Sequence, residues 1–212
     1  TRPNQFEPIL RWSGEIASAR IVPFPSVHPD DPRLAAHVHQ IADEGFKGLK
    51  LHPYYQDFFL DETRLGPLWA VAQERGLIVL CHTGFDLAFE RVRRGDPARV
   101  LRVLDALPRL RFVASHLGAW EDWDEVERHL AGRPILMDLS YALDGIGEAR
   151  ARELILRHPP EYMLFGTDSP WADQRETLAQ VRRLGLGPAR ERLLFGDNAA
   201  RLLGLEAPGV PG

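Results

Sequence analysis

Two histidines and one aspartate follow three separate apolar runs of this 212-residue sequence, and together they could bind a divalent metal. They are His82, His116 and Asp168. The apolar runs before them occupy residues 77–81, 110–115 and 162–167. Nitrogen and oxygen ligands of this kind bind zinc, manganese or iron, and an ion bound there activates water to hydroxide near neutral pH. The pattern therefore predicts a metal-dependent enzyme with these three ligands, and zinc is the expected ion.

Each of the three residues also has a purely structural interpretation. Asp168 could form an Asx-turn or an N-cap, because aspartate is common just after strands and Pro170 cannot continue a central strand. A single histidine at a strand end is more often a hydrogen-bonded core or turn residue. Three such residues at equivalent positions favour the metal site over three separate coincidences.

The elements that must position these residues alternate between strands and helices. Six βα units are predicted, starting at residues 21, 47, 77, 110, 135 and 162. Nearly continuous apolar strands indicate a parallel sheet covered by helices, and no Gly-rich fingerprint of a dinucleotide fold follows any of them. We expect an α/β fold of the (β/α)8 TIM-barrel type, a single incomplete domain over residues 1–212 whose first two strands are missing from this sequence.

Side-chain alternation along a strand indicates which residues share a face. His82 shares its face with Leu80, whereas Cys81 faces the surrounding helices and is predicted to be a packed, reduced thiol. Ala114 and Gly166 precede His116 and Asp168 by two positions. Small residues there would leave room for a bound group.

One histidine pair is not expected to bind metal. His37-Val38-His39 lies in a predicted helix over residues 33–44, where residues two apart point in different directions around the axis. We interpret the pair as part of a solvated helix surface.

The composition argues against nucleic acid and membranes as partners. The formal net charge is −4 with no basic block, which gives no electrostatic support for binding nucleic acid or an anionic membrane. One cysteine excludes an internal disulfide and fits a reducing, cytoplasmic location. No apolar run has the length of a membrane span. The expected partner is a small-molecule substrate, and a homo-oligomer is left open.

Four ordered motifs resemble the amidohydrolase superfamily, in particular its amidohydrolase-related branch of metal-dependent hydrolases and decarboxylases. They are Gly-Phe-Lys-Gly-Leu-Lys-Leu-His-Pro at 45–53, His-Thr-Gly at 82–84, Ser-His-Leu-Gly at 115–118 and Gly-Thr-Asp-Ser-Pro-Trp at 166–171. The resemblance implies that His82, His116 and Asp168 end the fifth, sixth and eighth barrel strands. It further implies that Asp168 is also the general base, and that His116 holds a second metal or moves protons.

The resemblance also has implications for the remaining metal ligands and for substrate binding. The family carries a first-strand HxH metal pair, and this sequence has no such strand. Some relatives carboxylate a fourth-strand lysine, which would be Lys50, but His52 lies on the same face nearer the strand end and we do not expect a carbamate. Lys50, His52, Tyr55 and Trp171 are the candidate substrate-binding residues.

The leading function is hydrolysis of a small amide, ester or lactone by metal-activated water. An alternative is non-oxidative decarboxylation of an aromatic or unsaturated acid, for which Lys50 and Arg91 are the basic residues that could hold a carboxylate. A deoxyribonuclease-like barrel has a similar Thr-Asp-x-Pro ending, but the acidic net charge argues against it. A truncated, non-catalytic barrel that acts as a binding or oligomerisation module is the alternative from another class.

Overall fold

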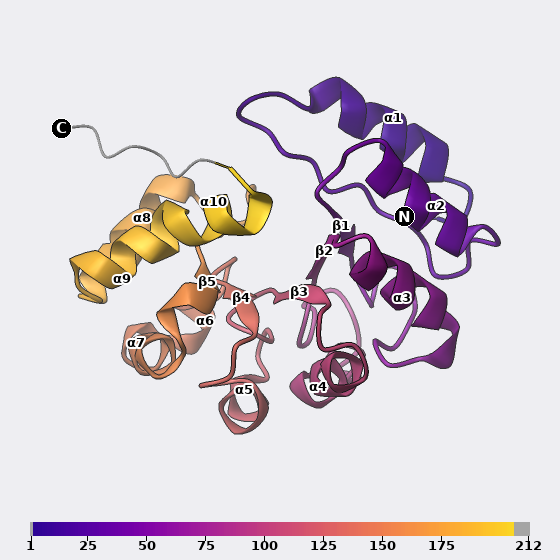
Figure 1. The fold of residues 1–212 in the computed structure, drawn as a ribbon. Coiled ribbons are helices and arrows are strands. Elements are labelled where there is room, and N and C mark those ends of the chain that lie inside the picture. The colour runs from indigo at the N-terminus through magenta and orange to yellow at the C-terminus, as the bar shows by residue number, and fades with distance from the viewer. Residues whose placement is uncertain (1, 206–212) are drawn as a thin grey trace. The chain divides into compact units, whose positions relative to one another are not determined.

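The computed structural model describes residues 2–205, which form an α/β fold with five strands (Figure 1). The strands are β1 (Gly48–Leu51), β2 (Ile78–Cys81), β3 (Arg111–Ala114), β4 (Leu136–Asp138) and β5 (Met163–Leu164). The helices are α1 (Phe6–Ile16), α2 (Leu34–Asp43), α3 (Gly66–Glu74), α4 (Pro97–Ala106), α5 (Trp123–His129), α6 (Leu143–Ile146), α7 (Glu148–Arg157), α8 (Gln174–Arg183), α9 (Pro188–Arg192) and α10 (Asn198–Leu203). Residues 1–113 and 114–212 form two compact units, which are described separately.

In the first unit, β1 and β2 are parallel neighbours. Lys50 pairs with Leu80, and Leu51 pairs with Cys81. Lys50 and Leu80 are half-buried, whereas the residues on either side of each are buried, so the two strands present one partly open face. Helices α2 and α3 lie side by side in this unit (Figure 1).

The predicted strand at residues 21–27 is absent, so the structure has five strands where six were expected. Ile21 makes an isolated antiparallel bridge to Ser18, and the carbonyl of Pro25 accepts one hydrogen bond from the Lys50 amide at 3.0 Å. Pro23 and Pro25 have no N–H group to donate. The segment therefore runs extended near β1 without forming a ladder.

In the second unit, β4 and β5 are parallel, with Met137 opposite Met163 and Asp138 opposite Leu164. β5 has two residues, although a longer strand leading to Asp168 was predicted. The side-chain amide of Asn198 donates to the carbonyls of Pro160 and Met163 at 2.7 and 2.8 Å. The Asn198 amide thus ties the start of α10 to β5.

The predicted helix over residues 33–44 is confirmed as α2, which spans Leu34–Asp43. Asp96 caps α4 by accepting the Arg99 amide. The first helix spans Phe6–Ile16. No helix within residues 2–205 combines the length and the apolar composition that crossing a membrane requires.

His158 makes the stability of the second unit depend on pH. Its side chain is 1% exposed and Nε2 donates to the carbonyl of Ile135 at 2.9 Å. Burial lowers the pKa of His158 below its ordinary value of 6.5, although the bond to Ile135 acts in the opposite direction. The unfolded chain therefore binds the proton more readily than the folded chain does.

We expect the free energy of unfolding to be highest above pH 6.5 and to fall as the pH drops below it, by at most about 1.4 kcal/mol per pH unit for one proton. His28 contributes in the same direction, because burial lowers its pKa too. His158→Gln, which retains an amide donor for Ile135, should reduce this slope in urea unfolding between pH 5 and 7.5. His129→Gln, at a more exposed position, is the control. Equal slopes for wild type and His158→Gln would contradict the prediction.

Candidate metal centre

The parallel register of β1 and β2 brings two histidines together. His52 and His82 each follow the last residue of their strand, and the His82 amide donates to the Leu51 carbonyl at 3.1 Å. Because Lys50 is opposite Leu80, the residues two positions further on face each other as well. The imidazole rings stack with their centroids 4.1 Å apart and their planes 16° apart.

Asp86 completes a group of three candidate metal ligands. Its Oδ2 lies 3.4 Å from His52 Nε2 and 3.9 Å from His82 Nε2. One ligand atom from each of the three residues lies within 4.8 Å of the other two. Two imidazoles and a carboxylate form a donor set that suits zinc or manganese.

Sequence reasoning predicted His82 as a ligand, considered His52 only as a substrate-binding residue and missed Asp86. Asp86 lies in the loop after β2, four positions beyond His82, and not at a strand end. The available signal was the His-x-x-x-Asp spacing in a loop that continues from a strand-end histidine. Spacing within a loop says little about distance, which is why the residue could not be assigned.

Buried hydrogen bonds fix the backbone at His52. Its amide donates to Gln56 Oε1 at 2.7 Å, and Gln56 Nε2 donates to the Val27 carbonyl at 2.6 Å. Gln56 is 1% exposed. These bonds connect the extended segment before α2 to the end of β1, so they position the first histidine.

The three residues can bind a metal ion, provided that the proton on His82 Nε2 moves to the other ring nitrogen. In the structure His82 Nε2 lies 2.9 Å from the Phe85 carbonyl, which can only accept, so this nitrogen carries the proton in that bond. A metal ion at Nε2 would require the other neutral tautomer of His82, in which the proton has moved to Nδ1.

Cys81 does not belong to the centre. Its thiol is fully buried, and burial raises its pKa to about 12, although the charge of Lys50 acts in the opposite direction. A metal-binding cysteine is a thiolate. The prediction of a packed, reduced thiol is confirmed, since the cysteine is free and buried.

Aromatic side chains surround the two histidines. Tyr55 meets the edge of His52 at 4.5 Å and Phe89 at 5.0 Å between ring centroids, and it is 58% exposed. The Tyr54 hydroxyl donates to the Val92 carbonyl at 2.6 Å and so ties down the loop that carries Phe89. The result is an open aromatic edge beside the histidines.

A positive charge lies on the Phe85 ring in the same loop. The Arg91 guanidinium stacks over the Phe85 ring at 3.9 Å, and Phe85 is the residue whose carbonyl contacts His82. Guanidinium groups bind carboxylates well. Arg91 is therefore a candidate anchor for an acidic substrate.

In the second unit, His116 is held in an unusual backbone conformation. It has φ of 61°, and Leu117 has φ of 54°, both in the left-handed region that non-glycine residues rarely adopt. The Asp138 carboxylate accepts the His116 amide at 3.2 Å and the Ser140 amide at 2.9 Å. Asp138, whose acid was noted at a strand end, thus braces the backbone here.

The His116 side chain is also oriented. Nδ1 lies 2.7 Å from the Ser140 carbonyl oxygen, so Nδ1 donates, and Nε2 is the nitrogen that can exchange protons. The ring is buried, with Trp120 edge-on at 6.2 Å. The geometry suits a residue that delivers or accepts a proton at one defined atom.

Asp168 lies in a turn and not at the end of a regular strand. It is exposed, has φ of 58°, and its carbonyl accepts the Trp171 amide at 2.9 Å. The expected alternation with Gly166 and Leu164 is therefore wrong. The gap at Gly166 does not hold a bound group either, because a Cβ there would overlap with the Ser140 hydroxyl.

The structure brings together only part of the predicted ligand set. His82 lies in the first unit with His52 and Asp86, whereas His116 and Asp168 belong to the second unit. The combination of His82, His116 and Asp168 stays a prediction. Lys50 is half-buried on β1, and Trp171 is 72% exposed.

The His37–His39 pair lies in a helix, as predicted, but the prediction that it forms part of a solvated surface is wrong for His37. Both residues lie in α2, as predicted. His37, however, is 7% exposed and its Nδ1 lies 2.6 Å from the Asp31 carboxylate. It is a buried, paired histidine and not part of a solvated face.

Structural comparison places this fold among TIM-barrel enzymes, and decarboxylases of aromatic acids recur among the similar structures. A TIM-barrel protein from Bordetella bronchiseptica is 23% identical with a TM-score of 0.71, over 94% of this chain and 72% of that chain. A dihydroxybenzoic acid decarboxylase from a Polaromonas species, with bound manganese and the inhibitor 2-nitroresorcinol, is 13% identical with a TM-score of 0.68, over 94% and 73%.

A hydrolase is similar to the same extent. A Pseudomonas putida protein described as a candidate 2-pyrone-4,6-dicarboxylic acid hydrolase is 19% identical with a TM-score of 0.66, over 95% of this chain and 78% of that chain. These identities support the fold, and the predicted α/β class of TIM-barrel type is confirmed.

Sequence comparison gives the family. A search among curated proteins finds no match. The sequence profile described as amidohydrolase (Amidohydro_2) matches residues 10–205, which include both histidines and the aspartate of the candidate metal centre. The chain therefore belongs to the amidohydrolase family.

Proposed function

We propose that this protein catalyses the metal-dependent, non-oxidative decarboxylation of a small aromatic carboxylic acid. The observation that carries the proposal is the His52–His82–Asp86 cluster with an exposed aromatic edge beside it. The recurrence of aromatic-acid decarboxylases among similar structures supports the same chemistry. It also favours this alternative over the hydrolysis that was the leading prediction.

His52, His82 and Asp86 are the residues that would hold the metal in the first unit. A bound divalent ion supplies Lewis acidity and neutralises negative charge on the substrate. Zinc was the expected ion, and the manganese in the Polaromonas enzyme makes manganese an equal candidate.

The substrate would be held by its ring and by its carboxylate. Tyr55 and Phe89 offer aromatic faces and edges at the cluster, and a substrate ring gains from such contacts. Arg91 offers a bidentate site for the carboxylate. Lys50 and Trp171 stay candidates for substrate binding from sequence alone.

Decarboxylation breaks the bond between the ring carbon and the carboxyl carbon. The electron pair stays on the ring carbon, which takes up one proton as carbon dioxide leaves. We assign delivery of that proton to His116, because the bond from its Nδ1 to the Ser140 carbonyl fixes the orientation of the ring. Asp168, exposed and without a carboxylate partner among the described residues, is proposed as a further metal ligand.

Hydrolysis of a lactone or a similar small carbonyl compound is the second candidate. The similarity to the Pseudomonas putida protein favours it. In that reaction Asp168 would accept the proton of the attacking water, and His116 would protonate the departing oxygen. The two candidates thus use the same residues and differ in the atom that is protonated.

Incubation with 2,6-dihydroxybenzoate and with 2-pyrone-4,6-dicarboxylate, in the presence of manganese or zinc, separates the two candidates. We expect release of carbon dioxide and resorcinol from the first compound. Opening of the lactone ring with no decarboxylation would favour hydrolysis. No turnover of either compound, together with no metal in the purified protein, would favour a non-catalytic module.

Removal of one ligand should weaken metal binding. We expect Asp86→Asn and His52→Ala each to lower the affinity for manganese and zinc by at least about tenfold in calorimetric titration, because a three-residue site loses one of its donors. Asp43→Asn is the matched control, since Asp43 pairs with Arg75 on the surface of the same unit.

The same titration tests the ligand set predicted from sequence. Unchanged affinity in Asp86→Asn, combined with loss of binding in Asp168→Asn, would contradict the cluster of the first unit. It would instead support His82, His116 and Asp168 as the ligands.

The aromatic edge should contribute to binding of an aromatic ligand. We expect Phe89→Ala and Tyr55→Ala each to weaken binding of 2-nitroresorcinol by about 0.5–1.5 kcal/mol, the usual value of an aromatic pair. Leu156→Ala removes an exposed apolar side chain in the second unit and serves as the control. Full affinity in both aromatic variants, measured by calorimetry, would exclude this edge from the binding site.

A further inference from the structure

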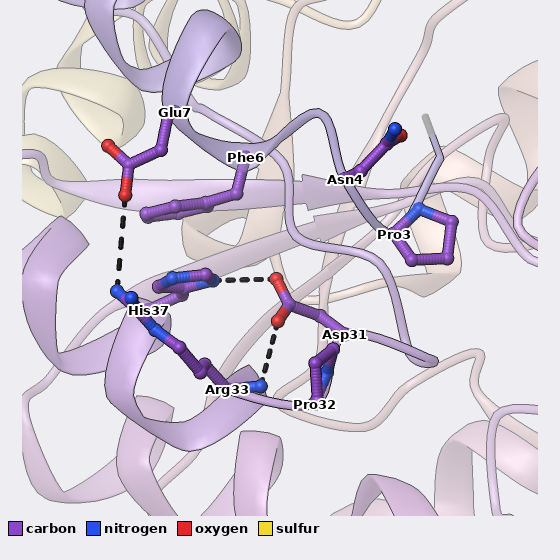
Figure 2. Close-up of a pocket in the computed structure, with 8 residues that line it drawn as sticks. All are labelled: Pro3, Asn4, Phe6, Glu7, Asp31, Pro32, Arg33 and His37. Carbon is purple, nitrogen blue, oxygen red and sulfur yellow. Dashed lines mark hydrogen bonds and ion pairs between the residues drawn. The ribbon is translucent and has the colours of Figure 1, made fainter.

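A cavity of about 310 Å³ lies in the first unit, between α1 and the turn that leads into α2 (Figure 2). Phe6, Glu7, Arg33 and His37 are among the residues that line it. None of its lining residues belongs to the His52–His82–Asp86 cluster. The cavity is therefore independent of the proposed reaction.

The His37 ring is held rigidly at the wall of this cavity. It stacks on Phe6 with ring centroids 3.8 Å apart and planes 7° apart. Its Nδ1 lies 2.6 Å from Asp31 Oδ2, while Asp31 Oδ1 accepts the Arg33 amide at 2.8 Å. An ionised carboxylate only accepts hydrogen bonds, so the proton of a neutral His37 lies on Nδ1. Nε2 then presents a lone pair.

This second nitrogen has no partner among the described residues. Nε2 is buried and makes no hydrogen bond, although His37 as a whole is 7% exposed. Buried polar atoms are rarely left unpaired in native structures. In Figure 2, Glu7 and the end of the Arg33 side chain lie at the edge of the Phe6–His37 stack opposite Asp31. Nε2 is covered in this structure, so a ligand at that edge would meet it once the exposed Glu7–Arg33 pair has moved aside.

The Arg33 guanidinium is available to the same ligand. Its ion pair is with Glu7 at 3.9 Å, and the two side chains are 63% and 60% exposed. Such an exposed pair is weak and easily exchanged. A ligand at this edge must therefore offer a hydrogen-bond donor to His37 Nε2 and an anionic acceptor to Arg33. Pro3, Phe6 and Pro32 supply apolar walls around it.

We propose that this cavity binds a small hydroxy acid. The hydroxyl group donates to His37 Nε2, and the carboxylate takes the place of Glu7 on the Arg33 guanidinium. The volume is at the lower limit for small-molecule sites, so the ligand is no larger than one ring. A histidine backed by a carboxylate is also common in metal sites, but the charge of Arg33 opposes a cation here.

Matched acids with and without a hydroxyl group test the proposal. The probes are lactate against propionate, and 3-hydroxybutyrate against butyrate. Nitrogen-15 NMR of labelled histidines follows His37 Nε2, with His37→Gln used to assign its signal. We expect at least one hydroxy acid to shift this signal saturably, and its parent acid to bind about fivefold more weakly or not at all. A hydrogen bond between neutral groups is of this strength.

Arg33→Gln should weaken the hydroxy acid by about tenfold, and Arg20→Gln, at an exposed position of the same unit, should not. Arg33 is exposed, so its substitution leaves the fold intact even if His37→Gln disturbs the stack on Phe6. No shift with any acid, or equal affinity for an acid and its hydroxy derivative, would overturn the proposal. A shift caused by zinc chloride alone would assign the cavity to a metal instead.

Discussion

The register between β1 and β2 is the constraint on which the candidate metal centre depends. Because side chains alternate, a slip of one residue would turn His52 away from His82 and bury Lys50. Gly48 secures the close approach of the strands, since a Cβ there would overlap with the Ile78 carbonyl oxygen. The stacked imidazoles are therefore a consequence of backbone pairing, and Asp86 needs only a short loop to reach them.

Three histidines of this chain differ in the surroundings of their imidazole nitrogens. His158 donates Nε2 to a carbonyl and keeps its other nitrogen in the core, where burial lowers the pKa and the ring stays neutral. His37 donates Nδ1 to a carboxylate and turns Nε2 toward a cavity. His82 faces another histidine and an aspartate. The residue type is the same in each case, so the hydrogen-bond partner and the exposure of the ring determine its chemistry.

Sequence reasoning reached the fold class and the strand-end position of His82 because both depend on local patterns. Apolar runs alternate with helices, and His82 closes such a run. Sequence reasoning failed where contacts between distant residues or an irregular backbone determine the structure. Residues 21–27 are apolar and extended, but their prolines cannot build a ladder, and Asp86 approaches the histidines through a loop. His37 is buried because Phe6 and Asp31 cover it, which helical periodicity within α2 cannot reveal.

The choice between decarboxylation and hydrolysis depends on which atom receives a proton. An imidazole backed by a carboxylate holds its second proton firmly, because the negative charge stabilises the imidazolium. His116 is backed by the Ser140 carbonyl, which carries no full negative charge and stabilises the imidazolium less. In the proposed reaction His116 is therefore better suited to release a proton to carbon than to retain one. A proton donor of this kind agrees better with decarboxylation than with attack by water on an acyl group.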